Sequence, residues 1–238
     1  MNNAVQLFFM PFAGGSARSF DMLRPYLADE FEVHVFEYAG HGTRRKEPFY
    51  ESLQAMARDA ALFVTQRRNN RPYALFGYSM GSLVVYEMFA QEAILDPPVH
   101  FFLASHDSPD SRWEGQHYYG MQEEDFILML RKMGGLDRVD DKTLHNRFFQ
   151  KIYMEPIRED YRLLAEYTMS SRVVLPAPVT MFYAPADITK ERIERWKPFM
   201  PQGSNIIAMG EKHFFLESHG KEIADSVRKS LRDAGEQK

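Results

Sequence analysis

Six short apolar runs, separated by longer amphipathic stretches, decide what kind of fold this sequence can form. They are rich in Val, Ile, Phe and Tyr, and they occupy residues 5–10, 32–38, 73–78, 100–105, 179–184 and 205–210. Within each run the apolar residues are largely continuous and do not alternate with polar ones. That pattern is typical of strands in a parallel sheet whose two faces are both covered. The sequence therefore predicts a mostly parallel β-sheet.

Segments with helical periodicity lie between these runs. Residues 52–68 form one segment, and residues 80–94 form another that is apolar almost all round. A third segment covers residues 217–233, and we expect its apolar stripe to face the body of the protein. The stripe recurs every four residues, at Ile223, Val227 and Leu231. Because strands alternate with helices and such crossovers are right-handed, the expected architecture is a doubly wound α/β fold.

The interval from residue 106 to residue 178 breaks this alternation, since it contains no strand pattern and is far longer than a crossover requires. Helical patterns occur at residues 122–133, 141–154 and 158–168. Residues 126–130 are apolar on every side, so we expect that helix to have apolar neighbours on two sides. The prediction is one domain over residues 1–238, with a helical cap inserted at about 107–170.

Composition narrows the class of protein. The chain has 238 residues, 45% of them hydrophobic, which suits one large α/β domain, and its net charge of −4 gives no sign of nucleic-acid binding. The absence of cysteine excludes disulfides, thiolate metal sites and a cysteine nucleophile. The opening MNNAVQLFFMPF lacks a basic segment, and no apolar stretch has the length of a membrane span. We therefore expect a cytoplasmic protein without a membrane partner.

The stretch LFGYSMGSLV, residues 75–84, holds a serine between two glycines where a strand-like run gives way to a helix-like one. In a G-x-S-x-G turn the serine adopts a strained backbone conformation and exposes its hydroxyl, and only small residues fit two positions before and after it. Gly77, Ser79 and Gly81 meet this requirement. The pattern predicts Ser79 as a nucleophile; the alternative is an ordinary glycine turn.

A serine hydroxyl is a weak nucleophile and needs a base. When the serine lies on such a turn, its partners follow in the order acid and then histidine, each just beyond a later strand. His213, in MGEKHFFLE, comes three residues after the last predicted strand and is the expected base. His219 is the rival, although it falls at the start of the terminal helix.

The third member of such a site is an acid that orients the imidazole and stabilises its charged form. Asp187 follows the predicted strand 179–184, one strand before the histidine, and is our expected acid. Asp107 follows the preceding strand and is the alternative. A helix-capping role is the other interpretation of either aspartate.

Two backbone amides are needed for the negatively charged oxygen of a tetrahedral intermediate. The amide of Met80, directly after the serine, is the first expected donor. The second should come from the loop MPFAGGSARSF after the first strand, where Gly14 and Gly15 let the backbone curl. Ala13 or Phe12 is therefore the expected second donor, and a plain glycine turn is the alternative.

With these residues assembled, the chain resembles the type II thioesterases that accompany nonribosomal peptide and polyketide synthases, almost from end to end. LFFMPFAGGSARSF resembles that family's first strand and oxyanion loop, and FGYSMGSLVVYE resembles its nucleophile turn, where a histidine often replaces Tyr78. MGGLDRV and PIREDYRLLAEY are similar to its cap, and ADITKERIERW and GEKHFFLE to its acid and histidine segments. AGHGTRRKEP and SHDSPD depart from loops that are usually more basic.

The resemblance implies an α/β-hydrolase fold and hydrolysis of acyl thioesters through an acyl-enzyme intermediate, in proofreading or release. The partners would be acyl or peptidyl carrier proteins, whose phosphopantetheine arm carries the substrate, so no cofactor or metal of the enzyme's own is expected. Apolar side chains of the cap are candidates for lining an acyl pocket, or else form the cap's own core. They are Met121, Phe126, Met129, Met133, Phe148, Phe149 and Met154.

Four basic residues follow the first two predicted strands, and loops after parallel strands share the sheet edge where ligands bind. Carrier proteins of this kind are typically acidic, so these residues are candidates for docking one; solvated loop charges are the alternative. The four are Arg18, Arg44, Arg45 and Lys46.

Two other functions fit parts of the pattern. A carboxylester hydrolase would use the same serine, histidine and acid on a small ester, and fold and motif do not separate it from a thioesterase. A non-catalytic scaffold that binds acyl carriers is the second alternative. The presence of all three expected catalytic side chains disfavours a scaffold.

Overall fold

A six-stranded parallel sheet forms the centre of the computed structural model, which describes residues 5–94, 96–111, 115, 117–137 and 139–236. The strands are β1 (Gln6–Met10), β2 (Glu32–Val35), β3 (Tyr73–Tyr78), β4 (His100–Ala104), β5 (Val179–Tyr183) and β6 (Asn205–Ala208). Their spatial order is β2-β1-β3-β4-β5-β6, and every neighbouring pair is parallel. All six predicted strands are confirmed, and so is the predicted parallel sheet.

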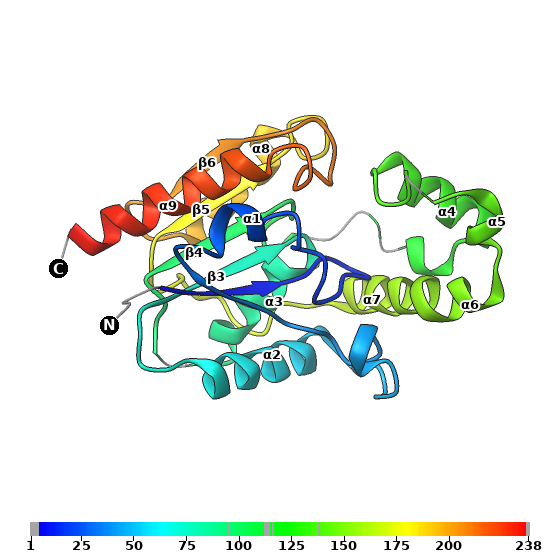
Figure 1. The fold of residues 1–238 in the computed structure, drawn as a ribbon, viewed down its shortest axis with the longest axis horizontal. Helices are drawn as coiled ribbons and strands as arrows, with labels where there is room; N and C mark the ends of the chain where they lie inside the picture. Colours follow the sequence, from blue (N-terminus) through cyan, green and yellow to red (C-terminus); the bar gives the residue numbers. More distant parts are fainter. Residues whose placement is uncertain (1–4, 95, 112–114, 116, 138, 237–238) are drawn as a thin grey trace.

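Helices cover both faces of this sheet (Figure 1). On one side lie α1 (Arg24–Leu27) and α9 (Gly220–Glu236), and on the other lie α2 (Leu53–Arg67) and α3 (Met80–Ala90). Side chains of β1 alternate between the two layers. Leu7 and Phe9 join the apolar cluster under α9, whereas Phe8 and Met10 join the cluster with α2 and α3. A strand buried on both faces needs a continuous apolar run, which is what the sequence provides.

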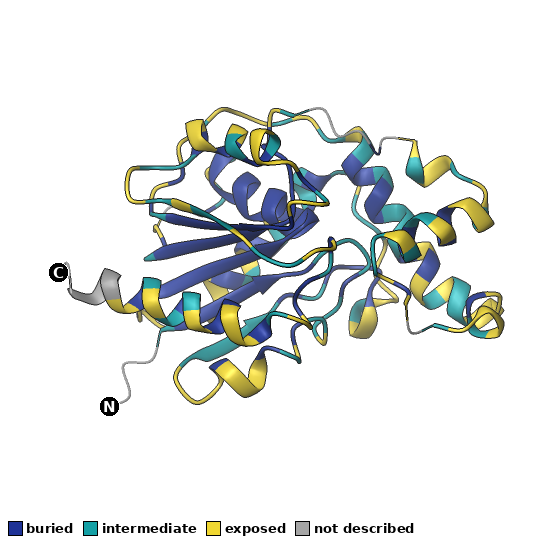
Figure 2. Ribbon diagram, turned by 90° about the horizontal axis from the view of Figure 1, so that it is seen from above, coloured by how far each residue is buried: buried dark blue, intermediate teal, exposed yellow. Residues whose placement is uncertain are grey.

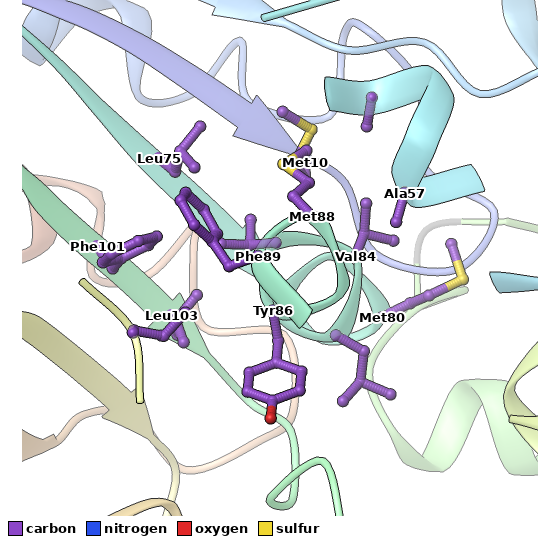
Figure 3. Close-up of a cluster of buried hydrophobic side chains, with 14 of the residues drawn as sticks. Met10, Ala57, Leu75, Met80, Val84, Tyr86, Met88, Phe89, Phe101 and Leu103 are labelled. Atoms are coloured by element: carbon purple, nitrogen blue, oxygen red, sulfur yellow. The ribbon is translucent and has the colours of Figure 1, made fainter. Parts of the chain in front are cut away.

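Helix α3 lies at the centre of the larger apolar cluster (Figure 3), and all 11 of its residues are buried. Its side chains Val84, Met88 and Phe89 pack beside Met10 of β1 and Leu75 of β3. The buried strands appear as the dark centre of Figure 2. Because α3 is fixed on all sides, the residue that precedes it is held firmly at the edge of the sheet.

The terminal helix α9 buries the predicted stripe, with Ile223 and Val227 fully covered and Leu231 8% exposed. No helix formed by the described residues combines the length and the apolar character that crossing a bilayer requires.

The cap consists of helices that follow β4 and lie beyond one end of the sheet (Figure 1). They are α4 (Glu123–Lys132), α5 (Asp141–Leu144), α6 (Arg147–Phe149), a π-helical segment Gln150–Met154 and α7 (Glu155–Glu166). The cap has its own apolar cluster, separate from the two clusters that sandwich the sheet. Phe126, Leu130, Leu144 and Tyr161 belong to it.

Two expectations about the cap are wrong in detail. Helix α4 buries one face only, because it lies at the outer surface, and Leu128 is 62% exposed. The single helix expected over residues 141–154 is divided into α5, α6 and the π-helical segment. Pro156 follows that segment, and a proline has no N–H for the usual bond to the carbonyl four residues earlier, which accounts for the local change of register.

The remaining helical segments are short. They are α8 (Lys190–Ile193) and the 3₁₀ turns Gly42–Arg44, Tyr118–Gly120 and Glu194–Phe199.

Candidate active site

Ser79 lies on the sharp turn between β3 and α3, and its backbone has the strained conformation that the motif predicts, with φ 53° and ψ −119°. The two flanking glycines are required by close contacts. A Cβ atom on Gly77 would lie 2.4 Å from the carbonyl oxygen of Gly81, and one on Gly81 would lie 2.0 Å from that of Met10. Since no side chain fits either position, this turn demands glycine on both sides of the serine.

Loops after three different strands bring Ser79, His213 and Asp187 together. His213 follows β6, and its Nε2 lies 2.9 Å from the Ser79 hydroxyl oxygen. Asp187 follows β5, and its Oδ2 lies 2.7 Å from Nδ1 of the same ring. The rival base, His219, instead lies 2.8 Å from the hydroxyl of its neighbour Ser218.

The direction of these hydrogen bonds suits nucleophilic catalysis. An ionised carboxylate only accepts, so Asp187 favours the tautomer that carries its proton on Nδ1. Nε2 of His213 is then an acceptor that faces the Ser79 hydroxyl. The arrangement allows the imidazole to take the serine proton while the carboxylate stabilises the resulting charge.

The alternative acid, Asp107, is engaged elsewhere. Both of its carboxylate oxygens pair with the guanidinium of Arg192, one of them 3.1 Å from Nε. The Asp107 side chain is 7% exposed, so this pair is largely removed from water. The structure therefore brings Asp187, and not Asp107, to the imidazole.

Two hydroxyl groups hold the main chain of His213, and sequence reasoning did not identify either of them. The Tyr78 hydroxyl donates to the His213 carbonyl oxygen at 2.6 Å and accepts from the Phe215 amide at 3.1 Å. Ser105 donates to the same carbonyl at 3.2 Å. Burial raises the pKa of Tyr78 above its usual value, so the hydroxyl keeps its proton. In the sequence, the sole hint of the contact between Tyr78 and the His213 main chain was the position of a tyrosine directly before the serine.

The loop after β1 forms a tight turn beside Ser79. The Gly15 amide donates to the Phe12 carbonyl oxygen at 2.8 Å, and Gly14 has a φ of +75°, which favours glycine. Ala13 lies at the tip of this turn. Among the described residues, no acceptor is found for the Ala13 amide. Met80 is the first residue of α3, and the first N–H groups of a helix have no partner within the helix.

Two cavities meet at Ser79, and Ala13, Tyr161 and His213 border both of them. The first has a volume of about 260 Å³ and a wall of mixed character, slightly more polar than apolar. Its polar lining comes from Ser105, His106, Asp107, Asp187 and Arg192. The second has a volume of about 420 Å³ and an apolar wall. Its apolar lining includes Phe12, Leu130, Leu136, Phe149, Ile157 and Phe214.

The apolar cap residues take different positions. Phe149 lines the apolar cavity, whereas Met133 lines the more polar one. Phe126 and Met154 belong to the core of the cap, and Met121 and Met129 pack against it. Phe148 is 72% exposed and lines neither cavity.

The expected docking residues divide into one that is engaged internally and three that are exposed. Arg44 donates to Glu47 at 2.6 Å and to Asp59 at 2.7 Å, so its charge is compensated within the protein. Arg18, Arg45 and Lys46 are exposed at the same edge of the sheet as Ser79.

The described part of the chain contains no cluster of three or more His, Cys, Asp or Glu side chains arranged to hold a metal ion.

Comparison with known proteins places the chain in a family. Residues 5–231 match the family model described as the thioesterase domain. The gramicidin S biosynthesis protein GrsT of Aneurinibacillus migulanus is 26% identical over 233 residues, which cover 96% of this chain and 89% of GrsT.

Solved structures show the same fold. RedJ, a thioesterase from the prodiginine biosynthetic pathway in Streptomyces coelicolor, superposes with a TM-score of 0.83 at 27% identity, covering 95% of this chain and 86% of RedJ. ClbQ, from the colibactin NRPS/PKS pathway, superposes with a TM-score of 0.88 at 22% identity and covers 99% of this chain and 100% of its own. The expected α/β-hydrolase fold is thereby confirmed.

Proposed function

The chain belongs to the thioesterase domain family, and from this premise we propose that it hydrolyses acyl thioesters on the phosphopantetheine arm of acyl or peptidyl carrier proteins. The proposal assigns Ser79 as nucleophile, His213 as general base and Asp187 as the acid that orients it. The amides of Met80 and Ala13 are the proposed oxyanion donors. The observation that carries it is the continuous chain of hydrogen bonds from Ser79 through His213 to Asp187.

The first half of the reaction forms an acyl-enzyme. His213 takes the Ser79 proton as the serine oxygen attacks the thioester carbonyl, and the two amides stabilise the negative oxygen. Collapse of this intermediate breaks the carbon–sulfur bond. A thiol has a pKa of about 8.5, so the sulfur leaves as thiolate without prior protonation, which an amine leaving group would need. The departed thiolate then takes the proton that His213 received from Ser79, so the arm becomes a free thiol and the imidazole is neutral again.

The second half releases the acid. A water molecule gives a proton to His213 and attacks the acyl carbonyl, and the same two amides stabilise the new negative oxygen. When the bond to Ser79 breaks, His213 returns the proton to the serine oxygen. The products are a carboxylic acid and the free thiol of the arm, and the enzyme is regenerated.

The two cavities support a substrate with a limb on each side of the reacting carbonyl. An acyl thioester on a carrier arm has this form, with the acyl group on one side and the arm on the other. Both cavities reach Ser79 and differ in polarity, so the two limbs meet different surroundings. The relatives named above, from gramicidin S, prodiginine and colibactin biosynthesis, support an assembly-line carrier as the partner.

The decisive experiment measures turnover of an acyl-carrier thioester and of its oxygen-ester analogue in parallel, with wild type and Ser79→Ala. We expect the wild type to hydrolyse the carrier thioester and the Ser79→Ala variant to be inactive yet folded. An active-serine probe should label the wild type at Ser79. Turnover of the oxygen ester alone would identify a carboxylester hydrolase, and activity in Ser79→Ala would refute the mechanism.

A further inference from the structure

We infer that Asp160, a residue of cap helix α7, positions the loop that carries the proposed oxyanion donor Ala13, with His41 as its buried counter-ion. The inference rests on the proposed function, since it assigns a role in the same reaction. Asp160 is a positioning residue and does not line either cavity.

A strong hydrogen bond joins the cap to the loop. The Gly14 amide donates to Oδ2 of Asp160 at 2.7 Å, between residues 146 positions apart in the sequence. This N–H belongs to the peptide unit that joins Ala13 to Gly14. A hydrogen bond to a charged acceptor is about twice as strong as a neutral one, so the carboxylate holds this peptide unit in a fixed orientation.

The neighbouring peptide unit is fixed from the other side. The Phe12 carbonyl accepts from the Gly15 amide at 2.8 Å, and this carbonyl shares its peptide unit with the Ala13 N–H. In a trans peptide the C=O and N–H bonds point in opposite directions, so the Ala13 amide points away from the turn. Both peptide units that flank Ala13 are thus held, one within the loop and one by Asp160.

His41 compensates the charge of Asp160 inside the protein. Its Nε2 lies 3.0 Å from Oδ2 of Asp160, and its Nδ1 lies 3.0 Å from the carbonyl oxygen of Ala39. A carbonyl oxygen and an ionised carboxylate both accept, so both ring nitrogens carry protons and the ring is an imidazolium. Burial alone would lower the pKa of His41, but the Asp160 carboxylate outweighs it and raises the pKa.

The side chains of His41 and Asp160 are only 3% and 2% exposed. A buried charge pair is costly unless each partner is fully satisfied, and here the carboxylate also accepts the Gly14 amide. The pair therefore joins three segments: the loop after β1, the loop after β2 and helix α7.

Helix α7 also packs directly on the loop. A Cβ atom on Gly14 would lie 2.2 Å from Cγ1 of Ile157, so the helix leaves room only for glycine here. One turn further along the same helix, Tyr161 borders both cavities. The helix that contacts the substrate cavities is thus the helix that orients the oxyanion loop, which couples the position of the cap to the geometry of the reaction.

The test compares Asp160→Ala, Asp160→Asn and a matched control, Glu87→Ala. Glu87 is also a buried carboxylate that ties the end of the cap to the body, since it accepts from Tyr167 and Ser170, but it does not contact the loop. Removing one oxyanion donor costs about 10²–10³ in kcat. We expect Asp160→Ala to lower kcat by about 100-fold. KM should change little, because the substrate binds before the negatively charged oxygen forms that needs the Ala13 amide.

Asp160→Asn should stay within about 10-fold of wild type, because the amide oxygen accepts the same Gly14 hydrogen bond. Glu87→Ala should lower thermal stability and leave kcat per folded enzyme unchanged. In amide proton spectra, the Gly14 signal of the wild type should lie at low field and move upfield in Asp160→Ala alone. If Asp160→Ala does not fold, Asp160→Ser replaces it, since its shorter side chain falls short of Gly14.

Unchanged kcat in the Ala variant, equal losses in the Ala and Asn variants, or a loss matched by Glu87→Ala would each overturn the inference. All variants are assayed on an acyl-carrier thioester and on p-nitrophenyl acetate. If the wild type cleaves only the oxygen ester, the proposed substrate is wrong, whereas the Asp160 effect is still measured on the ester. The two failures are therefore distinguishable.

Discussion

Asp107 and Arg192 form a two-point ion pair, and this relationship separates two aspartates that the sequence alone leaves as competing candidates. Each aspartate follows a strand of the sheet, one strand apart. Only Asp187 reaches Nδ1 of His213, at 2.7 Å. The Arg192 guanidinium holds Asp107 in the wall of the polar cavity.

We predict that Asp187→Asn lowers kcat by about 10⁴-fold, because an amide favours the wrong imidazole tautomer. Asp107→Asn should leave kcat near the wild-type value. It should nevertheless lower the free energy of unfolding, since Arg192 loses the partner of a largely buried pair. Steady-state kinetics and denaturant titrations of both variants check this. The reverse ranking of kcat would transfer the role of the acid to Asp107.

The hydroxyl of Tyr78 is predicted to support catalysis through the main chain of His213. Tyr78→Phe removes the bond to the His213 carbonyl and should lower kcat by about 10-fold, since small displacements of a catalytic group are costly. Tyr73→Phe is the matched control at the other end of β3, because Tyr73 also donates to a main-chain carbonyl, that of Asp96. Each variant should lose about 1–3 kcal/mol of stability. Equal kcat in the two variants would contradict the prediction.

Local sequence patterns were sufficient for the strands and the elements that carry the catalytic candidates. Continuous apolar runs identify buried strands, and the G-x-S-x-G pattern predicts a turn in which both glycines are sterically required. Because the ends of parallel strands share one edge, the order of residues along the chain was enough to place His213 near Ser79. These inferences need only neighbours in the sequence and one topological rule.

Features that depend on contacts between distant segments were not predictable. His41 and Asp160 are 119 residues apart, and no local pattern in the sequence pairs them. Short elements were missed for a different reason: the four-residue helices α1 and α8 are too short to show periodicity. Arg44 was expected as a docking residue, and its contact with Asp59, 15 residues away on helix α2, has no local signal in the sequence.

Acid pH should destabilise the protein through His100. Burial lowers the pKa of His100 to about 4, and its Nε2 lies 2.9 Å from the Thr180 hydroxyl. In the unfolded chain His100 binds a proton near pH 6.5, so its contribution to stability is constant above that pH and falls as the pH drops from about 6.5 to about 4. At pH 4.5 this group should account for a loss of about 2–3 kcal/mol.

The check uses His100→Gln, which keeps a polar side chain but does not titrate. Urea unfolding at pH 7 and pH 4.5 should show a smaller drop in stability for His100→Gln than for wild type. The difference between the two drops should be about 2–3 kcal/mol. Identical drops would mean that other groups carry the acid sensitivity.

The last prediction concerns the docking of a carrier protein. Arg18 and Arg45 are exposed on loops after β1 and β2. Glu37 joins these loops, since its carboxylate accepts from the amides of Ala17 and Thr43.

An acidic carrier would meet this basic edge on its way to Ser79, although the net charge of the protein is −4. The double variant Arg18→Glu/Arg45→Glu should therefore raise KM for the acyl-carrier substrate by about 10-fold at low salt, and by less at high salt. Hydrolysis of a small acyl thioester should be unchanged. Arg71→Glu/Lys229→Glu makes the same charge change on exposed residues elsewhere, just before β3 and on α9, and should have little effect on either substrate. Equal losses on both substrates would assign Arg18 and Arg45 to the fold or the pocket, and no loss on either would mean that the carrier docks on another surface.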